Sequence, residues 1–328
     1  MRSHNSQRGA SRARSVSCAW RQGQPASACG VAAASCGRGL AAALAVVLLA
    51  ACTTGAPAGR GGSARVALVI GNAAYENAPA LINPTHDAAD MCAALAKAGF
   101  RTLCHTNVRD RAEFDARVKE YADALAAEGP SGVGVFYYSG HGVQAGQANF
   151  LIPTRADAES AAADPLRLLY GVDDLFERLR ARPSRFQLVI LDACRNDLFE
   201  DSAPRAPGRG VANRSRLVRA LENVARAGNG LAPIKDAPPG TMVLYATASK
   251  EAAFDGEGRN GPLTKHILAH IGTRGLTVEE FFKRVTSGVE TETLRDYRKR
   301  QTPFIYGSFS GRFCFAGCPG EAEVPPAF

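Results

Sequence analysis

Blocks of apolar and polar positions along the chain predict strands that alternate with helices. Six short runs rich in apolar residues have the length of strands, and most are bounded by Gly or polar residues. The runs at 65–72 and 240–247 each contain a continuous apolar stretch, 66–71 and 242–246, the pattern of a strand buried on both faces of a sheet. The expected strands are 65–72, 100–104, 132–138, 186–191, 240–247 and 302–307.

Between these runs, apolar residues recur at the three- and four-residue spacing of amphipathic helices. The expected helices are 87–98, 109–128, 171–181, 262–271 and 277 to about 293. A short segment at 147–153 is typical of a hairpin arm, and its Pro153 excludes it from the centre of a sheet. The alternation predicts an α/β fold with a mostly parallel sheet of about six strands and helices on both faces.

The first 64 residues differ in pattern from the rest. An apolar run at 40–51 is too short to span a bilayer and has the length of a signal-peptide core. It ends in Leu-Ala-Ala-Cys52, which resembles the lipobox of bacterial lipoproteins. That resemblance implies lipid on Cys52, a membrane partner and an exported chain anchored in the cell envelope, on the outer membrane if the cell has two. An ordinary signal peptide with an unrelated Cys is the alternative.

The expected organisation is therefore a signal peptide at 1–51, a flexible tether at 52–64, the main folded domain at 65–313 and a tail at 314–328. The region before the apolar run is long for a leader. One interpretation is that translation starts downstream of Met1. The tether is rich in Gly, Ala, Pro and Thr and has no apolar periodicity.

The net charge of +8 looks at first like the signature of a nucleic-acid-binding protein. Six arginines and no acidic residue lie in 1–51, so the remaining chain has 33 basic and 31 acidic residues. The basic excess belongs mainly to the leader. This distribution removes most of the argument for a nucleic-acid partner.

Two reactive side chains follow apolar runs of strand length. His141 lies in Ser-Gly-His-Gly142, and Cys194 lies in Asp192-Ala-Cys-Arg-Asn. In α/β sheets, the carboxyl ends of the strands form the edge where ligands bind. A thiol needs a base to become a nucleophile at neutral pH, and an imidazole within reach supplies one. Backbone N–H groups of Gly142 and Cys194 are candidates for an oxyanion hole.

These motifs, together with Asn83-Pro-x-x-Asp87, resemble the bacterial caspase-like peptidases, which are relatives of metacaspases. The resemblance covers about 65–313 and implies the three-layer caspase-hemoglobinase fold, a His141–Cys194 dyad and cleavage after a defined side chain. The separation of 53 residues between His141 and Cys194 agrees with a caspase-type pair. Some metacaspases require calcium, which the resemblance leaves open; the sequence itself requires no cofactor.

An acidic pocket for the substrate follows from the same residues. Asp192 and Cys194 share one face of an extended segment, and an acid beside a thiolate needs a cation to offset its charge. A substrate Arg or Lys supplies that cation. In metacaspases, acids at the places of Asp87 and Asp192 line the S1 pocket, and Ser249 is a weaker addition by the same resemblance. The alternative for Asp87 is a helix cap.

A basic insertion at 203–235 follows the expected nucleophile, with a local charge of +6, while the rest of the chain after the leader sums to −4. Caspase relatives have their inter-subunit linker here, so we expect self-cleavage after one of its arginines. A solvated surface loop is the alternative. The candidates are Arg205, Arg209, Arg214, Arg216, Arg219 and Arg226.

Four cysteines remain after the leader, the expected lipidation site and the expected nucleophile are set aside. Cys92, Cys104, Cys314 and Cys318 allow three connectivities, of which Cys92–Cys104 and Cys314–Cys318 are the local choice. Their spacing gives no paired zinc motif, so no metal site is expected.

The function predicted from these residues is a cysteine endopeptidase that cleaves proteins or peptides after Arg or Lys. Two other classes compete with it. One is a catalytically silent caspase-like module that binds peptides or partners, which the intact His141 and Cys194 disfavour. The other is a Cys-dependent amidohydrolase for small molecules, which would need a Lys or carboxylate constellation around its thiol.

Overall fold

The computed structural model describes 65–157, 164–182, 184–194, 216–225, 231, 234, 236–247, 253–254 and 256–319, with the backbone alone at 194 and 223–225. The leader, the tether and Cys52 lie outside the described residues, as do Ser249, Arg205, Arg209, Arg214 and Arg226.

The described residues form a sheet with the strand order β2-β1-β3-β6-β7-β8, and β4 and β5 extend it beyond β3. Within the six-stranded path all pairs are parallel except β7 with β8. The predicted α/β class and mostly parallel sheet are confirmed. The strands are β1 (Arg65–Gly71), β2 (Arg101–Thr106), β3 (Val133–Ala145), β4 (Ala148–Leu151), β5 (Tyr170–Gly171), β6 (Phe186–Cys194), β7 (Thr241–Tyr245) and β8 (Phe304–Gly307).

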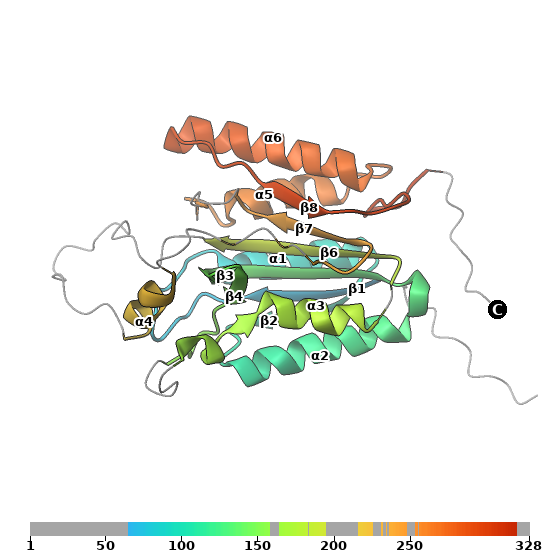
Figure 1. Cartoon of the computed structure of the whole chain (residues 1–328). Helices are drawn as coiled ribbons and strands as arrows, with labels where there is room; N and C mark the ends of the chain where they lie inside the picture. The colour runs from blue at the N-terminus through green and yellow to red at the C-terminus, as the bar shows by residue number, and fades with distance from the viewer. Residues whose placement is uncertain are drawn as a thin grey trace, which may run out of the picture. The chain divides into compact units, whose positions relative to one another are not determined.

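Helices cover both faces of this sheet because alternate strand residues are apolar on both sides. One core contains Val69, Val135 and Ile190 packed against α1, α5 and α6, and the other contains Leu68, Phe136 and Leu191 packed against α2 and α3. Figure 1 shows α5 beside α6 and α3 beside α2. The α-helices are α1 (Pro84–Lys97), α2 (Arg111–Ala127), α3 (Val172–Arg180), α4 (Arg216–Ala225), α5 (Pro262–Ile271) and α6 (Val278–Tyr297), with short 3₁₀ turns at Gly129–Ser131 and Pro165–Leu168.

Strand β3 is longer than the sequence predicted, and this changes the setting of His141. Its first part lies in the main sheet, and Gly142 to Ala145 pair antiparallel with β4. His141 therefore lies within a strand and not in a loop after its end. The additional pairing comes from the hairpin arm, which is itself paired with β5.

Two helices also differ from expectation. Helix α1 begins at Pro84, with Asn83 at the N-cap position, so Asp87 lies in the first turn and the helix-cap alternative for it is wrong. Within the basic insertion, α4 is a helix that was not among those expected. Its Leu217, Val218 and Leu221 are buried in a third apolar cluster with Val143 of β3 and Ile152 of the hairpin arm.

Two disulfides join the cysteines in the local pairing, Cys92–Cys104 between α1 and β2, and Cys314–Cys318 after β8. Phe315, between the latter two, is 2% exposed and packs in the core with α6. The folded domain thus continues past 313 to at least Cys318. Of the helices described, none is both long enough and apolar enough to cross a membrane.

Candidate functional site

The backbones of His141 and Cys194 lie opposite each other on two neighbouring strands at the centre of the sheet. Strands β3 and β6 pair in parallel from Val133 and Phe186 to His141 and Cys194. Since neighbouring strands are about 4.8 Å apart, the two residues are adjacent across the ladder. The sequence placed both at the carboxyl edge of the sheet, and the register brings them together there.

His141 is fully buried and is held by backbone and ring contacts. Its N–H donates to the Tyr75 hydroxyl at 2.8 Å, and the Tyr138 hydroxyl donates to its carbonyl at 2.8 Å. The ring Nε2 lies 2.7 Å from the Pro79 carbonyl, and the Tyr75 ring packs 4.5 Å away between centroids. A carbonyl only accepts, so Nε2 carries the proton. In the neutral ring, Nδ1 is then the basic nitrogen.

Gly140 makes this arrangement of His141 possible. Its φ is +151°, a conformation that side chains rarely adopt. A Cβ there would lie 2.6 Å from the Tyr75 hydroxyl and 2.8 Å from the Tyr138 hydroxyl. The absence of a side chain at Gly140 therefore leaves room for the two hydroxyls that bind the His141 backbone.

Asp87 of α1 lies buried beside the same strand edge. Its Oδ1 accepts from the Asn260 side chain and the Gly261 N–H, each at 3.1 Å, and its Oδ2 accepts from Ser139 at 3.2 Å. Burial raises the pKa of Asp87 to about 6, and these three hydrogen bonds oppose the rise. Ionisation of the buried Asp87 carboxyl is thus unfavourable in the absence of a cation.

Asp192 of β6 is half-buried and accepts a 2.7 Å hydrogen bond from Thr264 on α5. The Thr264 hydroxyl lies in turn 2.5 Å from that of Tyr137 on β3. Asp192 pairs in register with Ser139, the residue that donates to Asp87. Burial raises the pKa of Tyr137 well above its usual value, and Asp87 and Asp192 add to the effect. The two predicted carboxylates, Asp87 and Asp192, therefore lie close to the same part of β3.

A further carboxylate, Asp90, lies one turn after Asp87 on α1. Arg259 binds both of its oxygens, at 2.8 and 2.9 Å, and Asn260 donates to it at 3.0 Å. The Arg259 hydrogen bond lowers the pKa of Asp90. Asn260 thus bridges Asp87 and Asp90, and the loop before α5 lies over the first turns of α1.

Sequence reasoning missed the third carboxylate, Asp90, and the residues around the three carboxylates: Tyr137, Ser139, Arg259, Asn260 and Thr264. The three-residue spacing of Asp87 and Asp90 on one helix face was the available signal. The structure places Gly261, the last residue before α5, against Asp87.

The other predicted site residues are placed only in part. Gly142, the residue after His141, pairs with Leu151 of β4 in the antiparallel ladder. Arg216 and Arg219 lie exposed on α4. The described residues contain no cluster of three His, Cys, Asp or Glu side chains that could hold a metal ion.

Comparison with known proteins agrees with the fold. A family model described as Caspase domain matches residues 64–314. Caspase-1 from Spodoptera frugiperda is similar in structure with a TM-score of 0.50 at 10% identity, covering 80% of this chain and 93% of that one. Protein GSU0716 from Geobacter sulfurreducens has a TM-score of 0.51 at 18% identity, covering 75% and 94%. No curated protein matches the sequence.

Proposed function

The chain belongs to the caspase-domain family, whose members are cysteine peptidases, and from that premise we propose that it cleaves peptide bonds after Arg or Lys with Cys194 as nucleophile and His141 as general base. The register that sets His141 opposite Cys194 is the observation on which this proposal depends. The substrates are proteins or peptides with a basic residue at P1, the position before the scissile bond.

The tautomer of His141 that the Pro79 carbonyl favours suits this role. With Nε2–H bound to the Pro79 carbonyl, the basic Nδ1 takes the thiol proton of Cys194. The thiolate attacks the carbonyl carbon of the scissile bond, and the N–H groups of Gly142 and Cys194 stabilise the oxyanion. The C–N bond then breaks as the imidazolium returns its proton to the leaving amine. Water, deprotonated by His141, hydrolyses the thioester and frees the thiol.

The acidic cluster supports the basic specificity. Asp87 is buried, its three described hydrogen bonds come from neutral donors, and burial raises its pKa to about 6. An arriving guanidinium or ammonium would offset the cost of ionising it. Asp192 lies two residues before Cys194 on the same strand, within reach of the same side chain. An Asp at P1 would instead meet two like charges, which disfavours cleavage after Asp.

A peptide assay tests the proposal. Fluorogenic peptides that differ only in Arg, Lys or Asp at P1 are compared with wild type and Cys194→Ala, each with and without calcium. We expect cleavage of the Arg and Lys peptides by wild type alone. Equal cleavage of the Asp peptide would overturn the specificity, and no cleavage of any peptide would favour the silent binding module.

We also propose that the chain processes itself in the basic insertion and is anchored by lipid on Cys52. Arg216 and Arg219 lie in a helix whose apolar face is buried. A peptidase needs an extended substrate, so the arginines outside α4 are the better candidates. Wild type that yields fragments absent from Cys194→Ala supports processing. Loss of membrane fractionation in Cys52→Ser supports the anchor.

A further inference from the structure

We propose that the segment from Asn260 to Thr264, at the start of α5, is a positioning element that holds Asp87 and Asp192 in the orientation that binds a basic P1 side chain. The inference deepens the proposed function and rests on it. One short segment contacts two carboxylates that come from different elements, α1 and β6.

The contact to Asp192 has a defined direction. An ionised carboxylate only accepts, so the Thr264 hydroxyl donates its proton to Asp192 across 2.7 Å. Its oxygen is then left to accept, and the Tyr137 hydroxyl donates to it across 2.5 Å. Thr264 and Tyr137 are both 0% exposed. The chain of hydroxyls from Tyr137 through Thr264 thus fixes the orientation of the Asp192 carboxylate.

The contact to Asp87 comes from the other end of the segment. The Gly261 N–H and the Asn260 side-chain amide both donate to Oδ1, so this oxygen is held by two donors on consecutive residues. Asn260 also donates to Asp90, which Arg259 neutralises. The described hydrogen bonds to Asp87 therefore come from neutral donors alone, whereas Asp90 also binds the guanidinium of Arg259, the residue just before the segment.

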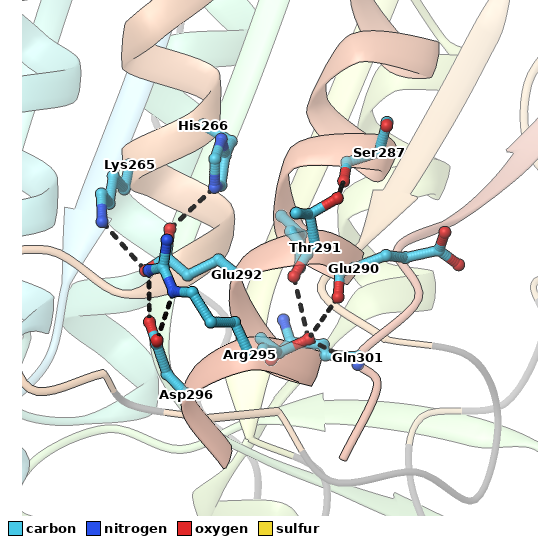
Figure 2. A network of polar contacts seen from close by, with 11 residues as sticks. Lys265, His266, Ser287, Glu290, Thr291, Glu292, Arg295, Asp296 and Gln301 are labelled. Atoms are coloured by element: carbon cyan, nitrogen blue, oxygen red, sulfur yellow. Dashed lines mark hydrogen bonds and ion pairs between the residues drawn. The ribbon is translucent and has the colours of Figure 1, made fainter. Parts of the chain in front are cut away.

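Neighbouring contacts fix the segment in place. Gly261 is the N-cap of α5, and Pro262 follows at its first turn. Directly after Thr264, Lys265 and His266 both bind Glu292 of α6, at 3.0 and 2.8 Å, as Figure 2 shows. The His266 ring lies against Gly288, where a Cβ would come within 2.3 Å of it. Rotation of α5 about its axis would break these contacts, so the position of Thr264 is fixed.

This arrangement predicts an effect on substrate binding and not on the chemical step. Thr264 is a positioning residue that acts through Asp192, whereas Cys194 and His141 act on the scissile bond. A hydrogen bond to a charged group corresponds to about a tenfold to hundredfold change in an equilibrium constant. We expect Thr264→Val to raise KM for an Arg peptide by at least about tenfold and to change kcat by less than about threefold.

The experiment compares kcat and KM for Arg peptides among Thr264→Val, Tyr137→Phe, Asn260→Ala, Thr264→Ser and a control. Thr264→Ser keeps the hydroxyl and should restore KM to near the wild-type value. Thr302→Val is the matched control, because Thr302 also donates to a carboxylate, Glu290, at 2.7 Å on α6. It should leave both constants unchanged.

The outcomes separate the two proposals. If wild type cleaves Arg peptides and Thr264→Val, Tyr137→Phe and Asn260→Ala have the same KM as wild type, the positioning role is overturned. The proposed function is not affected by that result. If the variants instead lower kcat together with the midpoint temperature of thermal unfolding, the role of the segment is merely structural, and this result also overturns the proposal. Should Thr264→Val fail to fold, Tyr137→Phe reports on the same chain of hydroxyls. Wild type that cleaves no basic peptide overturns the proposed function, and this inference with it.

Discussion

The hydroxyl of Ser139 donates a 3.2 Å hydrogen bond to Oδ2 of Asp87 and so connects the buried acid of α1 to the strand that carries His141. Ser139 lies two residues before His141 and pairs in register with Asp192. The proposed pocket and the proposed dyad are therefore successive steps along the same two strands. A substrate whose basic side chain reaches Asp87 and Asp192 would have its following peptide bond near Cys194.

Gly140→Ala should unfold the region around His141. The positive φ costs a side chain about 1–3 kcal/mol, and the added Cβ would overlap the hydroxyls of Tyr75 and Tyr138. Denaturant titration should show a loss of about 3 kcal/mol or more, together with loss of cleavage. Gly146→Ala is the control, since its φ is +62° and a Cβ there meets nothing within 4 Å. It should cost about 1 kcal/mol, and equal losses in both variants would contradict the packing argument.

Tyr75→Phe should impair catalysis more than it impairs folding. It removes the hydroxyl that accepts from the His141 N–H and keeps the ring that packs against the imidazole. A buried N–H without an acceptor costs about 1–3 kcal/mol, and the strain falls on the proposed base. We expect kcat to fall about tenfold with little change in KM. Tyr121→Phe is the control, because Tyr121 of α2 is also a buried tyrosine, and this variant should keep the wild-type kcat.

Asp87→Asn should stabilise the fold at neutral pH while it abolishes binding of basic substrates. The pKa of Asp87 is about 6 in the folded state, against an ordinary value of 3.8. Between these values the folded state binds more protons, so its stability falls as pH rises from about 4 to 6 and is constant above. Asn carries no charge and keeps an oxygen for Asn260 and Gly261. The gain should be about 1–3 kcal/mol at pH 8 and absent at pH 3, by denaturant titration.

Asp90→Asn provides the contrast for that measurement. Arg259 lowers the pKa of Asp90, so its contribution is present at neutral pH and is lost as pH falls. The pair is partly exposed, so its loss should cost only about 0.5 kcal/mol. A gain in stability at pH 8 from both variants would contradict the assigned cause, the burial of Asp87.

The sequence was sufficient to predict the mostly parallel sheet and to place the two reactive residues after strands, because both depend on local apolar patterns. That these two strands are neighbours is a finding of the structure. The apolar runs at 65–72 and 186–191 have the length of strands, and helices between strands favour parallel neighbours, although β7 and β8 pair antiparallel with α5 and α6 between them. His141 and Cys194 then reach the same edge. The extension of β3 past His141 was missed because it depends on pairing with β4, whose four residues carry little pattern of their own.

The residues around the carboxylates could not be predicted for a different reason. Thr264 and Asp192 are 72 residues apart, and Gly261 and Asp87 are 174 apart. A hydrogen bond between such residues leaves no periodicity in the chain. The start of α5 at Pro262 was predicted correctly, but nothing in that helix pattern indicates that its first turn faces two acids.

The pH dependence of substrate selection should report on Asp87 directly. A basic P1 side chain binds best when Asp87 is ionised, so kcat/KM for an Arg peptide should rise as pH increases through about 6. The proposed dyad also contributes to the pH dependence of cleavage, and a peptide with citrulline at P1 separates the two contributions because citrulline has a shape like that of Arg without the charge. The dyad affects both peptides equally. The ratio of their kcat/KM values therefore isolates the pocket.

In wild type this ratio should increase with pH by about tenfold or more and level off above about pH 7, since the cation gains an ionised partner. In Asp87→Asn the ratio should be smaller than in wild type and independent of pH. The pH dependence of kcat/KM for the citrulline peptide, which comes from the proposed dyad, should persist in this variant. A ratio in wild type that does not change between pH 5 and 8 would show that Asp87 does not contact the P1 side chain. Basic specificity would then have to come from Asp192 alone.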